Sequence, residues 1–299
     1  MTTKTFAVLP PVPAAIATPS RWADWGAWDA PRRIFTPRVL VAILTLFALL
    51  LAASEALAQM NGAQKPGVIA TVWRWLPLIL FGPPDQVGGF MLNILVSFLT
   101  MAIGTLTGVV LGVLQVSRGA IVRRLAWAVT QFFRNSPWLV LLFFAILLLP
   151  YRINLFGTSV EFPAWVKAVI GLALPIMANI AEVTRGAINS IPTGQWESAE
   201  SLAFSRGQTF RLIILPQCIK RMLPPWMNWY AILTMATTLI SIVGVSDSMT
   251  LTGQALAAEG GRSELLIPMY GLLLLLFFAY CYPIARFTLY LERRYALVT

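Results

Sequence analysis

Long apolar runs recur along this chain, and their length is close to what a lipid bilayer requires. A helix needs about 20 mostly apolar residues to cross the hydrocarbon core of a membrane. Six runs are predicted to be spans, and they cover roughly residues 38–57, 88–116, 137–150, 165–184, 224–244 and 266–288. The third run is short, and it can begin in the hydrophobic stretch that precedes Pro137.

The segments outside these runs divide the chain further. Residues 1–37 are rich in Pro, Ala and Trp and show no apolar period, so we expect an irregular cytoplasmic tail. Span 38–57 is then an extra N-terminal helix, followed by a periplasmic segment over 58–87. Within that segment, residues 68–81 are apolar but contain a charge and a proline, which favours a helix at the membrane surface. The remaining core covers 88–295.

Composition excludes an ordinary soluble protein. Hydrophobic residues make up 58% of the chain and charged residues only 11%, whereas a soluble domain carries about 25% charged residues. The net charge is +10, but the charges lie between the apolar runs and form no basic face, so no nucleic-acid partner is indicated. We expect an all-α integral membrane protein whose surroundings are the lipid bilayer.

The distribution of Lys and Arg predicts the orientation of the spans. With the N-terminus in the cytoplasm, the six spans place 17 of the 22 basic residues on the cytoplasmic side. The other side keeps only Lys65, Arg74, Arg152, Lys167 and Arg262. This bias is the positive-inside pattern of membrane proteins. It predicts a multi-pass protein with both termini in the cytoplasm.

One face of the second span carries small residues. Thr100, Gly104, Gly108 and Gly112 recur every four residues and therefore share a helix face. Small residues let a second helix backbone approach closely, which is how helices pack in lipid. Packing within this chain is the simpler interpretation, and a contact with another subunit is the alternative.

A polar stripe lies along one face of the fifth span. Thr234, Thr238 and Ser241 share one face of the predicted helix. These hydroxyls can line a translocation path, or they can bond to carbonyls of their own helix.

The fourth span contains Asn179 and, one turn later, Glu182. A carboxylate at membrane depth costs about 2.5–3.5 kcal/mol on insertion scales, so it usually faces a partner or a cavity. A pathway role for Glu182 and an ion pair with Arg185 are both consistent with the sequence.

No motif for enzymatic chemistry is present. The chain has no histidine, and Cys218 and Cys281 form no CxxC pair. None of its four lysines follows a glycine, so the Gly-Lys-Ser/Thr phosphate loop is absent. We therefore predict no catalytic residue, no metal site and no cofactor in this chain. Energy for any pumping has to come from an ion gradient or from another subunit.

The loop between the fourth and fifth spans, residues 185–217, is the most informative stretch. Thr193 is placed to cap a short helix that runs to about Ala203. Ser205 and Gln208 fit a capping box for a second helix, which Pro216 is expected to interrupt. Such a hairpin is suited to dock on a partner; the alternative is a simple connector that lies on the bilayer.

This loop resembles the EAA motif of ABC importer permeases, EAA-x3-G-x9-I-x-L-P. The matching positions keep the spacing of the motif in full, and they are Glu197, Ser198, Ala199, Ala203, Ile213, Leu215 and Pro216. Two positions depart from the motif, because Ser198 replaces the first alanine and Ala203 replaces the glycine.

Other stretches resemble one branch of these permeases, the polar amino acid systems for histidine, glutamine, glutamate and arginine. The similar stretches are FFRNSPWLVLLFF (132–144), ANIAEVTRGAINSIPTGQWESA (178–199), TTLISIVGVSD (237–247) and YLERR (290–294). The likeness covers about residues 85–295.

The resemblance implies a type I importer permease core of five helices, with the extra N-terminal helix added to it. The chain would form half of a two-permease pore in the bacterial inner membrane. Its partners would be a dimer of ATP-binding subunits that hold ATP and Mg, a second permease chain (the same or a sister), and a periplasmic substrate-binding protein.

The EAA loop would form a coupling helix, and the residues expected to couple to the ATPase are Trp196, Glu197, Ser198, Ala199, Leu202 and Ala203. Direct contacts with the ATPase are expected from Trp196, Ala199, Leu202 and Ala203, and Glu197 is expected to pair with a basic group or to cap backbone amides. The residues expected along the substrate path are Asn179, Glu182, Thr234, Thr238 and Ser241.

Two other classes compete with this interpretation. One is a gradient-driven secondary transporter or channel without an ATPase partner, and the other is a membrane assembly subunit without transport. Many secondary transporters contain inverted repeats, but neither the loop nor any span recurs in this sequence. Co-purification of an ATPase would separate the first interpretation from both others.

Overall fold

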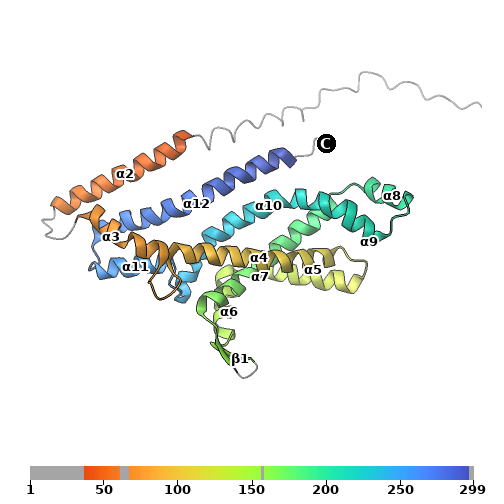
Figure 1. Cartoon of the computed structure of the whole chain (residues 1–299), viewed down its shortest axis with the longest axis horizontal. Coiled ribbons are helices and arrows are strands. Elements are labelled where there is room, and N and C mark those ends of the chain that lie inside the picture. The colour runs from red at the N-terminus through yellow and green to blue at the C-terminus, as the bar shows by residue number, and fades with distance from the viewer. Residues whose placement is uncertain (1–36, 61–66, 156–157, 296–299) are drawn as a thin grey trace, which may run out of the picture. The chain divides into compact units, whose positions relative to one another are not determined.

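The computed structural model describes residues 37–60, 67–155 and 158–295, and in this part the chain is almost entirely helical (Figure 1). The helices are α2 (Pro37–Met60), α3 (Val68–Phe81), α4 (Gly89–Gln115), α5 (Ala120–Arg134), α6 (Trp138–Leu148), α7 (Ala164–Asn189), α8 (Thr193–Ser201), α9 (Arg206–Gln208), α10 (Leu215–Ala236), α11 (Ser248–Ala258) and α12 (Leu266–Tyr295). Three short helices of other types are η3 (Thr209–Ile214), η4 (Thr237–Val243) and η5 (Ser263–Leu265).

Two features were not predicted. A small antiparallel hairpin joins β1 (Arg152–Leu155) to β2 (Thr158–Glu161), with Arg152 opposite Glu161. The segment expected to connect the last two spans contains the helix α11. Residues 1–46 and 47–299 form two compact units. The structure describes only 37–46 of the first unit, and the following paragraphs concern the second.

Four helical stretches are long and apolar enough to cross a membrane: Gly89–Gln115, Ala164–Asn189, Arg206–Val243 and Ser263–Arg294. They contain or overlap four of the predicted spans, so the prediction of an all-α membrane protein is confirmed. The apolar part of α2, Val41–Ala56, is shorter than these four. A helix also forms over the predicted 68–81, where α3 lies; its position at the membrane surface stays a prediction.

The predicted third span is not one straight helix. α5 and α6 are separate helices that are bent by 101° at the break between them. Pro137 causes the break, because proline disfavours helical backbone at the residue before it. α6 has only 11 residues, which is about 16 Å of helix against a hydrocarbon core of about 30 Å. The hydrophobic residues before Pro137 therefore do not extend α6.

The predicted interruption at Pro216 is also wrong. α9, η3 and α10 continue one another as a single helical stretch. Ahead of the proline, the Leu215 amide donates to the carbonyl of Phe210, five residues back, which widens the turn into a π-helix. α8 and α9 lie at one end of this stretch, and α11 lies at the other (Figure 1).

The core forms where α4 packs along α7. A Cβ added to Gly104 would lie 2.5 Å from the Ile176 side chain, and one added to Gly108 would lie 2.6 Å from the carbonyl oxygen of Met177. At Gly112 the nearest atom, in the side chain of Thr184, would lie 2.6 Å away. The small-residue face is thus filled within this chain, as expected. The buried cluster around it includes residues of α4, α6, α7, α10 and η4.

A buried lysine fixes the end of α6 against the start of α7. The ammonium group of Lys167, which is fully buried, donates hydrogen bonds to the carbonyls of Leu149 (2.7 Å) and Ile146 (3.4 Å). It also lies 3.7 Å from the ring centroid of Tyr151. A cation at a helix C-terminus satisfies carbonyls that have no partner within the helix and is favoured by the helix dipole. These contacts account for a charged residue inside a predicted span.

α8 ends in a left-handed turn built around an alanine. Ala203 has a φ of +58°, and the Phe204 amide bonds back to the carbonyl of Ala199 (3.1 Å). The Ala203 amide bonds to the carbonyl of Glu200 (2.9 Å). This pair of bonds is the Schellman ending of helices, in which glycine normally occupies the left-handed position. Ala203 stands where the EAA motif has glycine, so the sharp turn is kept without it. The predicted start of α8 is wrong in one detail, because Pro192 precedes the first turn and Thr193 makes no capping bond.

We predict that Gly108→Ala destabilises the chain, because the added methyl group collides with the backbone of α7. Overpacking of this kind typically costs about 1–3 kcal/mol. The control is Gly186→Ala, since nothing lies within 4 Å of a Cβ at that helical position. Thermal unfolding of the purified chain should show a lower midpoint for Gly108→Ala only. Equal midpoints would contradict the close α4–α7 contact.

We predict that Ala203→Gly stabilises the end of α8. A left-handed alanine carries about 1–2 kcal/mol of strain, and glycine removes most of it. The matched control is Ala257→Gly, an exposed position inside α11, where the same substitution should destabilise by about 1 kcal/mol. Hydrogen exchange at the Phe204 amide should slow in Ala203→Gly. Faster exchange there would show that the alanine is not strained.

Candidate functional site

α8 is held between the end of α7 and the start of the α9–α10 stretch. Its residue Ala199 is buried, and Trp196 is half-buried. Trp196 packs on a cluster formed by the end of α7, the residue Ile191 that follows it, η3 and α10, whose buried members are Ala187, Ile188, Ile191, Ile214 and Cys218. A capping box at Ser205 and Gln208 begins α9, as predicted. Apolar packing therefore fixes α8 on its own chain.

The other face of α8 is free of internal contacts of this kind. Glu197, Ser198 and Ala203 are exposed, and Leu202 exposes 71% of its surface. The six predicted coupling residues thus fall into two groups. Trp196 and Ala199 were expected to contact the ATPase, but they face their own chain and position the helix. The other four are presented outwards. An exposed leucine at the tip of a short helix is a suitable contact for a partner protein.

An arginine ties the two flanks of α8 together. Arg221, on α10, donates through Nη1 to the carbonyl of Ser190 (2.7 Å) and to its hydroxyl (2.8 Å). Ser190 is the residue that follows α7 and caps its C-terminus. A cation at this position satisfies a C-terminal carbonyl of α7 and links that end of α7 directly to α10.

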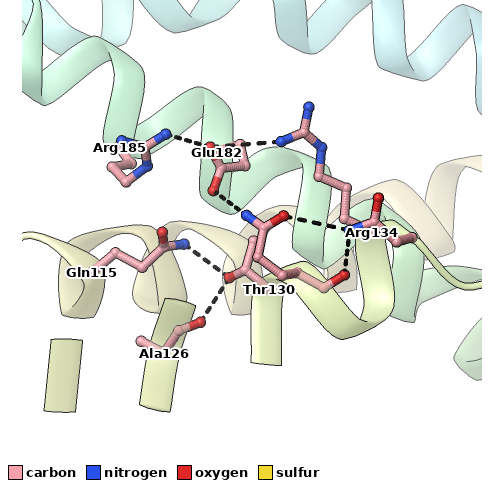
Figure 2. Close-up of polar contacts among 8 residues, drawn as sticks. Gln115, Ala126, Thr130, Arg134, Glu182 and Arg185 are labelled. Atoms are coloured by element: carbon pink, nitrogen blue, oxygen red, sulfur yellow. Dashed lines mark hydrogen bonds and ion pairs between the residues drawn. The ribbon is translucent and has the colours of Figure 1, made fainter. Parts of the chain in front are cut away.

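Glu182 lies at the centre of a second polar group, between α7 and α5 (Figure 2). Its Oε2 accepts a hydrogen bond from Arg185 Nη2 at 2.6 Å and lies 3.9 Å from Arg134 Nη1. Its Oε1 accepts from Gln131 Nε2 at 3.4 Å. The side chain is only 15% exposed, so these contacts take the place of most of its hydration. The predicted ion pair with Arg185 is confirmed.

The contribution of α5 to this group was not predicted from the sequence. Gln131 and Arg134 lie one turn apart, just before the break at Pro137, and both reach Glu182. The signal was present in the sequence, because Arg134 belongs to the stretch 132–144. The sequence did not locate the bend at Pro137, so it did not predict α5 as a separate helix beside α7.

The remaining predicted pathway residues bond mainly within their own helices. The Asn179 amide donates to the carbonyl of Pro175 (2.8 Å). The hydroxyls of Thr234, Thr238 and Ser241 donate to carbonyls three or four residues earlier in the chain. Among the described residues, no hydrogen bond joins these groups to Glu182. Their role along a path stays a prediction.

A buried network around Asn93 was missed by the sequence analysis. The Asn93 amide donates to Asp247 Oδ2 (3.2 Å) and to Thr237 Oγ1 (3.1 Å), and its carbonyl accepts from Ser248. Asp247 also caps α11 by accepting from the Thr250 amide (2.9 Å). Burial raises the pKa of the Asp247 carboxyl, and its hydrogen bonds oppose that shift. The network holds α4 to the start of α11 across 154 residues of sequence.

The described residues contain no group of three or more His, Cys, Asp or Glu side chains that could hold a metal ion.

Comparison with known proteins gives a family match over most of the core. The family model described as "Binding-protein-dependent transport system inner membrane component" matches residues 104–296. The probable amino-acid ABC transporter permease protein YckA of Bacillus subtilis is 37% identical over 213 residues, which are 71% of this chain and 90% of that protein. The glutamine transport system permease protein GlnP of Escherichia coli is 30% identical over 194 residues, 65% of this chain and 83% of that protein.

A third relative extends the likeness beyond the core. The glutamate/glutamine/aspartate/asparagine transport system permease protein BztC of Rhodobacter capsulatus is 30% identical over 290 residues. The match covers 91% of this chain and 65% of BztC. The sequence motifs suggested a likeness limited to about residues 85–295, but the similarity to this relative extends beyond that range.

Solved structures agree in fold. An amino acid ABC transporter crystallised with histidines aligns with a TM-score of 0.62 at 22% identity, over 77% of this chain and all of that one. The MetNI methionine ABC transporter, in an inward-facing conformation, aligns with a TM-score of 0.51 at 20% identity, over 76% of this chain and 95% of that one. With the family match and the YckA alignment, these results lead to one conclusion: the chain belongs to the family of binding-protein-dependent transport system inner membrane components, the permease subunits of ABC transporters.

Proposed function

We propose that this chain is the permease subunit of an ATP-driven importer of polar amino acids and forms half of its translocation pathway. The names of YckA, BztC and GlnP support amino acids as the substrate class. The complete transporter would contain a second permease chain, the same or a sister. It would also contain a dimer of ATP-binding subunits and a periplasmic substrate-binding protein. ATP and Mg belong to the ATP-binding subunits, which carry out the hydrolysis.

The observation that carries this proposal is α8. The EAA-like stretch from Glu197 to Pro216 begins on α8, a short helix that is packed on its own chain by one face and exposed on the other. Such a helix can fill a cleft in a separate ATP-binding subunit. The exposed residues Glu197, Ser198, Leu202 and Ala203 would make the contact, and Trp196 and Ala199 would hold the helix in place.

The contacts of α8 also support a route by which a displacement of α8 would reach the membrane spans. α8 rests on a cluster to which both α7 and α10 contribute, and Arg221 bonds α10 to the end of α7. A displacement of α8 would therefore move both helices together rather than bend one loop. When ATP binding closes the ATPase dimer, this linkage would turn the pore between its two orientations.

Glu182 is the residue that we assign to the substrate path. A zwitterionic amino acid carries an ammonium group, and a carboxylate accepts charge-assisted hydrogen bonds from it, which are about twice as strong as bonds between neutral groups. Asn179 lies one turn away, and the hydroxyls of Thr234, Thr238 and Ser241 would supply neutral groups along the same route.

Both termini would lie in the cytoplasm, which the 17-to-5 distribution of basic residues supports.

The coupling assignment predicts that the Leu202→Gln variant binds the ATP-binding subunit more weakly. Burying a leucine at an interface is worth about 1.5–3 kcal/mol, so affinity should fall about tenfold or more. The measurement is co-purification of the ATP-binding subunit with the tagged permease, read as ATPase activity. Glu200→Gln is the control, since Glu200 is also exposed on α8 and its 3.9 Å ion pair with Arg206 contributes little.

Thermal unfolding of the isolated permease should be unchanged by Leu202→Gln, because that side chain is already exposed. Co-purification that is equal in wild type and Leu202→Gln would contradict the docking role of α8. If no ATP-binding subunit co-purifies with the wild-type chain, the proposed function itself fails, in favour of a gradient-driven transporter or channel.

The pathway assignment predicts that Glu182→Gln changes which amino acids stimulate the ATPase, or lowers that stimulation, while the complex still assembles. Arg185→Gln is the comparison, because it breaks the same ion pair but leaves the carboxylate. If Glu182 binds substrate, only Glu182→Gln should alter the substrate profile. If the residue serves only the ion pair, both variants should reduce the yield of complex and keep the wild-type profile, which would refute the assignment.

A further inference from the structure

A basic cavity lies where the ends of α4 and α7 meet α5. Its volume is about 460 Å³, and its lining includes Arg123, Arg124, Arg185, Gln115, Trp127 and Asn189. Cavities of this size are within the range that bind small molecules and headgroups. Asn189 is the last residue of α7, so the cavity is on the end of that helix that leads into α8.

Positive charge in this region exceeds negative charge. The sequences of α4 and α5 contain no acidic residue, and α7 contains only Glu182. That carboxylate already contacts both Arg185 and Arg134 (Figure 2). Arg123 donates to the carbonyl of Ser117 (3.2 Å), and the described structure records no carboxylate partner for its charge. The cavity therefore favours an anion.

Two buried polar atoms at the cavity have no hydrogen-bond partner among the described residues. They are Oε1 of Gln115 and Nε of Arg185. Gln115 is only 4% exposed, and its Nε2 is committed to Thr130 Oγ1 at 2.8 Å, which orients the amide (Figure 2). A buried polar group left unpaired is unfavourable. A ligand that fits must therefore offer a hydroxyl to Gln115 as well as anionic oxygens to the arginines.

The surroundings indicate that such a ligand belongs to the bilayer. Ile121, Leu125 and Phe132 lie along one stripe of α5 and are 63–76% exposed. Arg124 and Trp127 form the next stripe of the same helix, by helical spacing. A helix with an exposed apolar stripe beside a basic one lies in the membrane interface and attracts anionic lipids. Acyl chains could extend along the apolar stripe while the headgroup enters the cavity.

We propose that this cavity binds the headgroup of an anionic glycerophospholipid, of the phosphatidylglycerol type. The phosphate would lie among Arg123, Arg124 and Arg185, and a glycerol hydroxyl would donate to Oε1 of Gln115. A bound lipid would join α5 to the ends of α4 and α7. This site goes beyond amino acid transport, because it involves neither the exposed face of α8 nor a transported molecule.

The test is native mass spectrometry of the full chain, purified in detergent and titrated with phosphatidylglycerol or phosphatidylcholine. The substitution is Arg124→Gln, at an exposed arginine for which the described structure records no carboxylate partner. Its matched control is Arg118→Gln, an exposed arginine in the turn before α5 that does not line the cavity. We expect phosphatidylglycerol to bind the wild type and Arg118→Gln equally. Arg124→Gln should bind it about fivefold more weakly, the usual effect of one basic residue near anionic lipid.

Three results would overturn the proposal. An equal loss of phosphatidylglycerol binding in Arg118→Gln would show that diffuse charge, and not the cavity, retains the lipid. Equal binding of phosphatidylcholine would show that the anionic glycerol headgroup is not recognised. Displacement of the lipid by inorganic phosphate at millimolar concentration would show a site for free phosphate. All arms are measured on the isolated permease, so their outcome is independent of whether it couples to an ATPase.

Discussion

The close contact between α4 and α7 is the constraint on which the rest of the structure depends. In lipid there is little hydrophobic drive to join two helices, so association relies on backbones that approach closely. Gly104, Gly108 and Gly112 permit that approach, and each would collide with α7 if it carried a Cβ. Because α7 is fixed in this way, Glu182 is held at a defined position beside α5. The end of α7, from which α8 continues, is fixed as well.

Broken helices then place the polar groups. The 101° bend at Pro137 separates α5 from α6, and it is this bend that lets Gln131 and Arg134 meet Glu182. Ahead of Pro216, a π-turn keeps the helix continuous, so α8 stays connected to a full-length span. In both places proline removes a backbone donor. The two outcomes differ: a three-residue gap separates α5 from α6, whereas η3 joins α9 to α10 without a gap.

Much of this fold could be predicted from the sequence, because apolar length and residue spacing are local properties. Four spans, α3, the small-residue face and the capping box at Ser205 were all read from patterns within about 25 residues. The bend at Pro137 and the continuity through Pro216 could not be decided in this way, since proline is compatible with either result. The Asn93–Asp247 network was also out of reach. It joins residues 154 positions apart, and nothing in the local sequence of α4 marks Asn93 as more than one polar residue in a span. For α8 the spacing predicted the helix, but only packing shows that Trp196 and Ala199 face inwards.

Three irregular points in the described part of the chain are held by a side chain that bonds to the backbone there. Lys167 bonds to the carbonyls at the end of α6, Asp247 caps α11, and Arg221 bonds to the carbonyl of Ser190. The Lys167 and Arg221 bonds join separate elements, whereas the Asp247 bond closes the first turn of α11. For the proposed coupling the Arg221 contact matters most, because it would make the end of α7 and the start of α10 one mechanical unit with α8 resting on it. A nine-residue helix on a flexible loop would absorb a displacement. In the proposed coupling, the same helix on two linked spans would pass the displacement on to both of them.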